Sequence, residues 1–277
     1  MTGSGHRREG SRSGRNNKTE DLSTTGGAFL KGFCVELAEV PIGVRCRHAN
    51  TVTFLREYQT EREPAFTVEP DPADLEQAQA EADRQDEAEG REPHRRPEPQ
   101  LESLALHRLL AERLPEYDVL LMHGSALCMD GAGYIFTAPS GTGKSTHAAL
   151  WRQVFGQRVR MLNDDKPLLR IREDGVTVFG SPWAGKHRLS CNASAPLRAI
   201  ARLERAAENR IEPMSRTEAF PVLLAQAYSS RDPAVMARIL RLERRILESV
   251  RFYTLRCNME PEAARIALAG MSQSLFR

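Results

Sequence analysis

Apolar and polar residues follow two different periods along this chain. Where they alternate, or where a short apolar run stands between turn residues, the pattern predicts β-strands. Where apolar residues recur every three or four positions, it predicts helices with one buried face. The expected strands cover 33–37, 42–46, 65–69, 119–122, 134–137, 159–162, 168–172, 176–179, 196–203 and 252–255; the expected helices cover 51–58, 71–86, 101–110, 147–155, 215–228, 233–250 and a last one from Pro261.

This mixture of strands and helices indicates a mixed α/β fold. Residues 1–27 are rich in Gly, Ser, Arg and Asn and hold almost nothing apolar, so we expect them to be a disordered tail. Residues 28–114 are expected to form a small N-terminal α+β extension. The larger core is expected over residues 115–277.

Charge is unevenly distributed along the chain. Residues 71–100 carry ten acidic and four basic side chains, a local net charge of −6 in a chain of formal charge +2, so the remainder carries +8. Within this stretch we expect an exposed acidic helix, since Leu75 is its only large apolar residue, followed by a linker over 89–100. The basic remainder suits a protein that handles phosphates or an acidic partner, and it equally suits ordinary solvated surface.

The cysteine pattern and the lack of long apolar runs indicate the cellular compartment that we expect for this protein. The five cysteines are scattered and form no C-x-x-C pair, which favours a reduced, cytoplasmic protein over a zinc or redox site. No run approaches the roughly 18 apolar residues that a membrane helix needs, so we expect no membrane partner.

The strongest chemical signal is the stretch over residues 138–146, Ala-Pro-Ser-Gly-Thr-Gly-Lys-Ser-Thr. It matches the phosphate-binding loop G-x-x-x-x-G-K-[ST], with Ala138 in place of the first glycine, and it lies between an expected strand and an expected helix. In such a loop Lys144 reaches the β and γ phosphates, and the Ser145 hydroxyl takes a place in the Mg²⁺ shell. ATP with Mg²⁺ is therefore the expected cofactor, held by Ser140, Gly141, Thr142, Gly143, Lys144, Ser145 and Thr146.

Two adjacent carboxylates follow a later strand. Asp164 and Asp165 come directly after the strand expected at 159–162, and ligands of open α/β sheets gather at the carboxyl ends of the strands. One carboxylate suits metal binding and the other suits a general base that takes the proton of an attacking hydroxyl. The alternative is a polar turn after a strand.

Two further features are weaker signals. His123 ends the strand at 119–122, where a histidine is either structural or functional. Residues 180–186 form a loop with two glycines and a proline, in which Lys186 is expected to clamp the phosphates and Trp183 to form a wall for the base or a peptide. A plain surface loop is the alternative.

Taken in order, His123-Gly124, the glycine loop and Asp164-Asp165 resemble the catalytic core of HPr kinase/phosphorylase, and more distantly that of ATP-dependent phosphoenolpyruvate carboxykinase. The compact HPr-kinase-like proteins, which include lasso-peptide serine kinases, are most similar, and the likeness runs from about Phe33 to the C-terminus. It implies a P-loop kinase core of this type. The glutamate and arginine of the family's later glycine motif are not present in residues 181–186.

The resemblance also implies roles for individual residues. It implies transfer of the ATP γ-phosphate to a serine or threonine hydroxyl of a small protein or peptide, with Asp164 as general base, His123 and Lys144 beside the reacting centre, and Ser145 and Asp165 near the metal. It allows a homo-oligomer, and nucleic acid is not an expected partner. Two alternatives stay open: a kinase acting on a small-molecule hydroxyl, and a nucleotide-binding regulatory module without catalysis.

Overall fold

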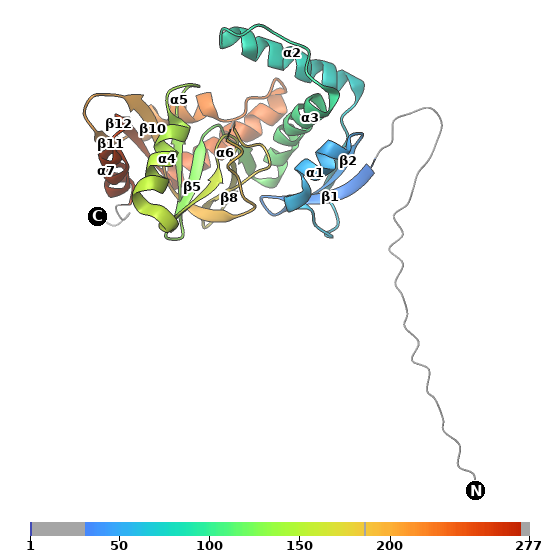
Figure 1. The fold of residues 1–277 in the computed structure, drawn as a ribbon, viewed down its shortest axis with the longest axis horizontal. Helices are drawn as coiled ribbons and strands as arrows, with labels where there is room; N and C mark the ends of the chain where they lie inside the picture. Colours follow the sequence, from blue (N-terminus) through green and yellow to red (C-terminus); the bar gives the residue numbers. More distant parts are fainter. Residues whose placement is uncertain (2–30, 186, 273–277) are drawn as a thin grey trace.

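The computed structural model describes Met1, residues 31–185 and residues 187–272 (Figure 1). Two sheets with their helices make up this part of the chain. A small sheet and an arm of two helices come first, and a large curled mixed sheet follows. The expected tail over residues 1–27 lies, apart from Met1, outside the described residues. No helix in the described ranges is long and apolar enough to cross a membrane.

The small sheet has three strands. β1 (Lys31–Leu37) and β2 (Val40–Cys46) form an antiparallel hairpin, and β3 (Phe66–Val68) pairs parallel with β2. The hairpin turns at Ala38 and Glu39, which both have positive φ, as a two-residue type I′ turn requires. Between β2 and β3 lie α1 (Ala49–Phe54) and a short 3₁₀ turn (Arg56–Tyr58).

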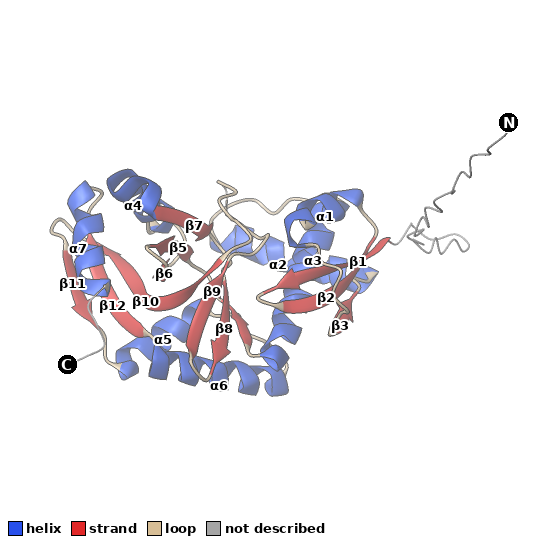
Figure 2. Cartoon of the chain, turned by 90° about the horizontal axis from the view of Figure 1, so that it is seen from below, coloured by secondary structure: helices blue, strands red, loops and turns tan. Residues whose placement is uncertain are grey.

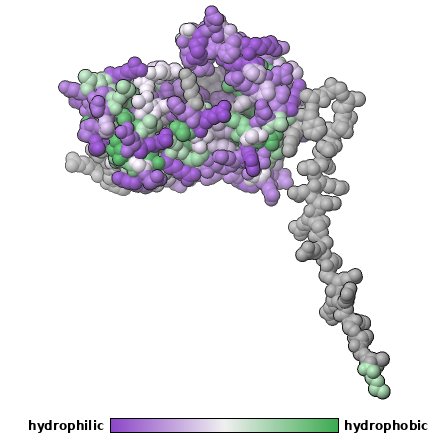
Figure 3. Space-filling model, viewed as in Figure 1, coloured by the Kyte–Doolittle hydropathy of each residue, from purple (hydrophilic) through white to green (hydrophobic). Residues whose placement is uncertain are grey.

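The acidic stretch forms the arm. Its helices are α2 (Pro72–Ala88) and α3 (Glu98–Arg113), which pack against each other, and the outward surface of α2 is almost entirely hydrophilic (Figure 3). The connection over residues 89–97 is held in place, because the buried Asp86 carboxylate accepts hydrogen bonds from Arg91 and Arg96. α3 begins at Glu98, inside the expected linker, since Pro99 is well suited to a first helical turn.

The large sheet has nine strands, and the twelve-residue β10 (Ser194–Arg205) lies at its centre. β10 pairs antiparallel with β9 near its start and parallel with both β6 and β12 further along. Because β10 bridges these two groups of strands, the sheet is mixed and curled. The other eight strands are β4 (Val119–Leu121), β5 (Ser125–Met129), β6 (Ala132–Thr137), β7 (Val159–Asn163), β8 (Leu168–Arg172), β9 (Gly175–Phe179), β11 (Arg210–Pro213) and β12 (Arg251–Cys257).

Helices cover both faces of this sheet (Figure 2). α4 (Lys144–Phe155) packs with α7 (Pro261–Met271) on one face, around the fully buried Trp151. α5 (Arg216–Gln226) packs with α6 (Pro233–Ser249) on the other. A short 3₁₀ turn (Leu114–Tyr117) joins the arm to β4, and another (Gly156–Arg158) joins α4 to β7.

Candidate functional site

The glycine loop lies between β6 and α4, as the sequence pattern predicts. Gly141 and Gly143 have φ angles of 77° and 124°, which residues with a side chain rarely adopt, so backbone conformation explains both glycines. The first N–H groups of a helix have no partner within the helix, so the start of α4, directly after the loop, is a ready anion site. The Lys144 ammonium folds back and donates to the carbonyls of Ala138 (2.9 Å) and Pro139 (3.3 Å).

An arginine from the neighbouring strand holds the loop from outside. Arg205, the last residue of β10, donates to the carbonyl oxygens of Thr142 (3.0 Å) and Gly141 (2.5 Å). These bonds point the loop carbonyls toward the guanidinium. They fix the outer side of the loop without occupying its amides, which are the groups that bind phosphate.

A cavity of about 510 Å³ opens beside the loop. β6, β10 and β12 run parallel, so their carboxyl ends meet at one edge of the sheet, and the cavity lies at this edge. Its volume is within the range of small-ligand pockets. The residues that line it are Gly141, Thr142, Gly143, Thr146, His147, Leu150, Leu203, Glu204, Arg205, Ala206, Cys257, Asn258 and Met259.

The acidic doublet follows β7 at the same sheet edge. β5 lies between β7 and β6 and is antiparallel to both, so β7 and β6 end on the same side, about 10 Å apart across two strand spacings. Asn163 Oδ1 accepts the N–H groups of Asp165 (2.7 Å) and Lys166 (2.6 Å), which fixes the turn that carries both carboxylates. The doublet and the loop are thus held by two strands of one sheet, with β5 between them.

Asp164 is the buried member of the doublet, with a residue exposure of 4%. Its Oδ1 accepts a hydrogen bond from Ser125 Oγ at 2.9 Å. Its Oδ2 is buried and has no hydrogen-bond partner among the described residues. A buried carboxylate oxygen without a partner is costly, so this atom fits a cation or a donor proton that a ligand brings.

Asp165 is more exposed and contacts two side chains. Its Oδ1 lies 3.3 Å from His123 Nε2 and 3.7 Å from Lys166 Nζ. Burial raises the pKa of Asp165, an effect that the charges of Lys166 and Lys144 oppose. Burial, with the charges of the same two lysines, lowers the pKa of His123 to about 3. The histidine is therefore neutral at pH 7, so its 3.3 Å contact with Asp165 Oδ1 is not an ion pair.

Backbone bonds hold His123 where its ring meets Asp165. Its N–H donates to the Gln226 carbonyl at 2.7 Å, and its carbonyl accepts from Thr137 Oγ1 at 2.9 Å. The N–H of Gly124 donates to the Asp165 carbonyl at 3.0 Å. The ends of β4, β6 and α5 therefore meet at this histidine, next to the start of the glycine loop.

The loop after β9 faces the arm. Trp183 Nε1 donates to the Ser103 carbonyl of α3 at 3.1 Å, and the ring packs edge-on against Phe54 and His107. Trp183 thus joins this loop to α1 and α3, whereas the sequence suggested a wall for the base or a peptide. Lys186, expected to clamp the phosphates, lies outside the described residues.

The predicted residues lie together in the structure, but their roles remain predictions. Ser140, Gly141 and Thr146 are exposed, and Ser145 is half-buried at the start of α4. Among the described residues no cluster of three or more His, Cys, Asp or Glu side chains could hold a metal ion. A metal here would therefore need oxygen ligands from a nucleotide besides Ser145 and a carboxylate, the usual arrangement for Mg²⁺.

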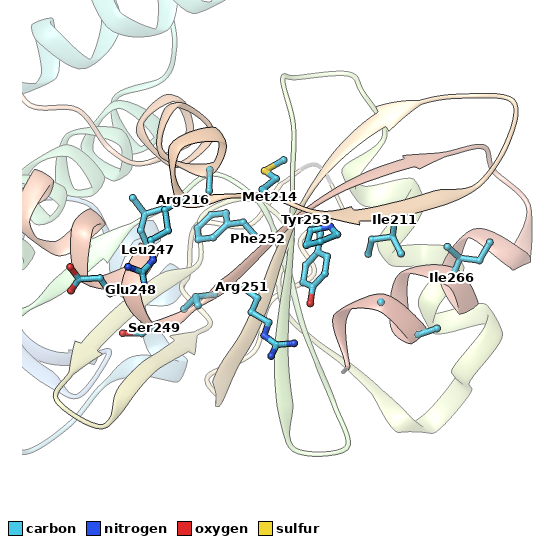
Figure 4. Close-up of a pocket in the computed structure, with 15 residues that line it drawn as sticks. Ile211, Met214, Arg216, Leu247, Glu248, Ser249, Arg251, Phe252, Tyr253 and Ile266 are labelled. Carbon is cyan, nitrogen blue, oxygen red and sulfur yellow. The ribbon is translucent and has the colours of Figure 1, made fainter. Parts of the chain in front are cut away.

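A second cavity, of about 640 Å³, lies between β11, β12 and the ends of α6 and α7 (Figure 4). Phe252, Tyr253 and Ile211 contribute to its lining, and Arg216, Arg251 and Glu248 also border it. It contains no residue of the glycine loop or of the acidic doublet. The glycine loop borders the cavity of about 510 Å³ instead.

Sequence reasoning did not single out four residues of this site: Lys166, Arg205, Ser125 and Gln226. Ser125 and Gln226 carry no motif, and their position depends on strand pairing far along the chain. Arg205 is one of many arginines. Lys166 had a usable signal, because it adjoins the acidic doublet in a chain with few lysines.

No family model matches this sequence, and no curated protein matches it. Among solved structures, the chain is similar to the Hpr(Ser) kinase/phosphatase from Coxiella burnetii, with 10% sequence identity and a TM-score of 0.32. The match covers 55% of this chain and 99% of that chain. At such a low TM-score the likeness carries no argument about the site, which depends on the geometry above.

Proposed function

We propose that this protein is a kinase that transfers the γ-phosphate of ATP to a serine or threonine hydroxyl of a small protein or peptide. Residues 115–277 form a P-loop kinase core of the HPr kinase and phosphoenolpyruvate carboxykinase type, and residues 28–114 are its N-terminal extension. The observation that carries the proposal is the unpartnered Oδ2 of Asp164, buried at the same sheet edge as the glycine loop.

The loop side of the site binds the donor. The triphosphate lies against the amides of the loop and the start of α4, and the nucleoside enters the adjoining cavity. Lys144 then exchanges its two backbone carbonyls for phosphate oxygens. Because burial lowers the pKa of Lys144, a phosphate partner favours its charged form.

The doublet serves the metal and the acceptor. Ser145 and Asp165 would hold Mg²⁺ together with phosphate oxygens, and the bound ion would neutralise charge on the β and γ phosphates. Asp164 accepts the proton of the acceptor hydroxyl. The acceptor oxygen then bonds to the γ phosphorus as the bond to the β–γ bridging oxygen breaks, and ADP leaves. His123, neutral, contacts Asp165 and orients it.

Two variants and one control test the proposal. Lys144→Ala should abolish Mg·ATP binding in calorimetry, whereas Asp164→Asn should bind Mg·ATP but lose transfer from labelled ATP to acceptor peptides by about 100-fold or more. Asp174→Asn, which alters an exposed acid in the β8–β9 turn, is the matched control and should act normally. Transfer at the normal rate by Asp164→Asn would show that the base is wrongly assigned. Wild-type protein that binds Mg·ATP without any transfer or hydrolysis would favour the regulatory module.

A further inference from the structure

Lys166 lies at the centre of the charged groups of the candidate site. Its ammonium is 3.7 Å from Asp165 Oδ1, and its charge acts on His107, His123 and Lys144. These three side chains come from α3, the end of β4 and the start of α4. The charge of one lysine therefore acts on groups of the arm, the acidic doublet and the glycine loop.

The backbone of Lys166 is fixed by buried groups. Its N–H donates to Asn163 Oδ1 at 2.6 Å, and its carbonyl accepts from Ser181 Oγ at 2.6 Å. Asn163 and Ser181 are fully buried and bonded to each other. The side chain, in contrast, is 28% exposed. A fixed main chain with a long, partly solvated side chain lets the ammonium move over a short range from a defined origin.

Lysine is rare in this chain, so the presence of two lysines at the candidate site is informative about the charge that the site requires. Of 39 lysine and arginine residues, five are lysine and 34 are arginine. Arginine thus supplies nearly all of the positive charge, yet both cations that act on Asp165 are lysines, Lys144 and Lys166. The two residue types are not interchangeable, because lysine offers a compact point charge that fits between phosphate oxygens.

The two ammonium groups also repel each other across the site. The charges of both lysines act on the Asp165 carboxylate, and the Lys166 ammonium lies 3.7 Å from its Oδ1. Among the described groups, Lys166 thus acts together with one like charge, Lys144, and beside one carboxylate, Asp165. An anion placed between the two lysines would turn their repulsion into two attractions.

We propose that Lys166 is a second phosphoryl-binding residue, whose ammonium contacts the γ-phosphoryl oxygens from the acceptor side while Lys144 contacts them from the loop side. The inference rests on the proposed kinase function and adds a catalytic residue to it. The bonds made and broken are those of the transfer described above. Lys166 stabilises the negative charge of the phosphoryl group as it moves between the two oxygens.

The test measures Mg·ADP binding with and without aluminium fluoride. Mg·ADP combined with aluminium fluoride mimics the phosphoryl group during transfer. Wild-type protein should bind Mg·ADP more tightly when fluoroaluminate is present. Lys166→Met should keep its Mg·ADP affinity, lose this tightening, and hydrolyse Mg·ATP about 100-fold more slowly. Lys166→Arg should recover part of both. Arg152→Met removes an exposed charge from α4 and should match wild type.

The possible failures are distinguishable. Fluoroaluminate tightening that survives in Lys166→Met would overturn the role of Lys166 and leave the kinase proposal standing. A Lys166→Met variant that loses Mg·ADP affinity itself would place Lys166 in support of the doublet rather than at the phosphoryl group, which also overturns the inference. Wild-type protein that fails to bind Mg·ADP would refute the proposed function and this inference with it.

Discussion

Burial and nearby lysines set the charge of the side chains at the reacting centre. The charges of Lys144 and Lys166 both act on Asp165 and on His123. A histidine in this position cannot take up a second proton without adding a third positive charge to a partly desolvated site. Burial and the two lysine charges therefore oppose a role for His123 as a proton-carrying acid at neutral pH.

This charge state can be observed directly. Since the pKa of His123 is lowered to about 3, the ring should stay neutral from pH 5 to pH 8 in ¹⁵N-edited NMR spectra of the imidazole. In Lys166→Met one of the causes of this lowering is gone, so the pKa should move upward. A wild-type His123 resonance that titrates near pH 6.5 would contradict the burial and charge argument.

Another buried acid lies on α6. Glu243 is fully buried, and neither of its oxygens has a hydrogen-bond partner among the described residues. Burial raises its pKa from 4.5 to about 7. Between these values the folded protein binds more protons than the unfolded chain, so the free energy of unfolding should fall as pH rises from about 4.5 to 7 and level off above that.

Glu243→Gln removes the titration while keeping the shape of the side chain. Relative to wild type, the variant should gain about 3 kcal/mol of unfolding free energy on going from pH 4.5 to pH 8. Urea unfolding of both proteins at the two pH values measures this difference. Parallel pH profiles for the two proteins would show that Glu243 has a partner or an ordinary pKa.

At the scale of elements, the sequence predicts the strands and helices that carry the motifs. β6, α4 and β7 lie within one to three residues of their expected bounds, because a buried apolar run and an amphipathic repeat are local signals. β11 (Arg210–Pro213) was not expected, since a short edge strand with two charged residues and a proline shows no alternation. α5 ends two residues early, where Ala227 forms a bridge with Met122.

In the candidate site, too, some residues have a local sequence signal and others are placed only by the fold. The loop and the doublet are contiguous in sequence, so their chemistry can be recognised without a fold. Lys166 and Arg205 belong to no motif, so their part in the site depends on where the fold places them. The parallel alignment of β6, β10 and β12 brings Arg205 to the loop. The contact of Trp183 with α3 also depends on tertiary packing, which no local pattern reports.

Gly180, at the start of the loop after β9, lies where backbone packing leaves no room for a side chain. A Cβ at this position would lie 1.9 Å from the Cys191 carbonyl and 2.6 Å from the Leu162 carbonyl, both backbone atoms that cannot move aside cheaply. Gly180→Ala should therefore destabilise the protein by about 3 kcal/mol or more and displace the end of β7. Thermal unfolding, together with Mg·ATP affinity, measures both effects.

Gly32 is the matched control for this substitution. It lies on β1, and a Cβ there would meet no atom within 4 Å. Gly32→Ala should change stability by less than about 1 kcal/mol. Equal melting temperatures for the two alanine variants would refute the packing argument at Gly180.

At the scale of the whole molecule, the small sheet and the large sheet share one hydrophobic core. Val35 and Ile42 of the small sheet belong to the same buried cluster as Leu168 and Phe179 of the large one. Trp183 adds a hydrogen bond between the two parts. Because the exposure of this shared surface would be costly, the N-terminal extension and the core should unfold together.

The chain has two tryptophans, and each reports on one part of the molecule. Trp151 lies fully buried in the core around α4, and Trp183 lies at the contact between the site loop and the arm. In Trp151→Phe the remaining Trp183 reports on the contact between the site loop and the arm. In Trp183→Phe the remaining Trp151 reports on the core around α4. In each variant the fluorescence midpoint in urea should coincide with the midpoint of circular dichroism at 222 nm. A Trp183 signal that changes well before the dichroism would mean that the arm opens first and that the candidate site is assembled from two independently stable parts.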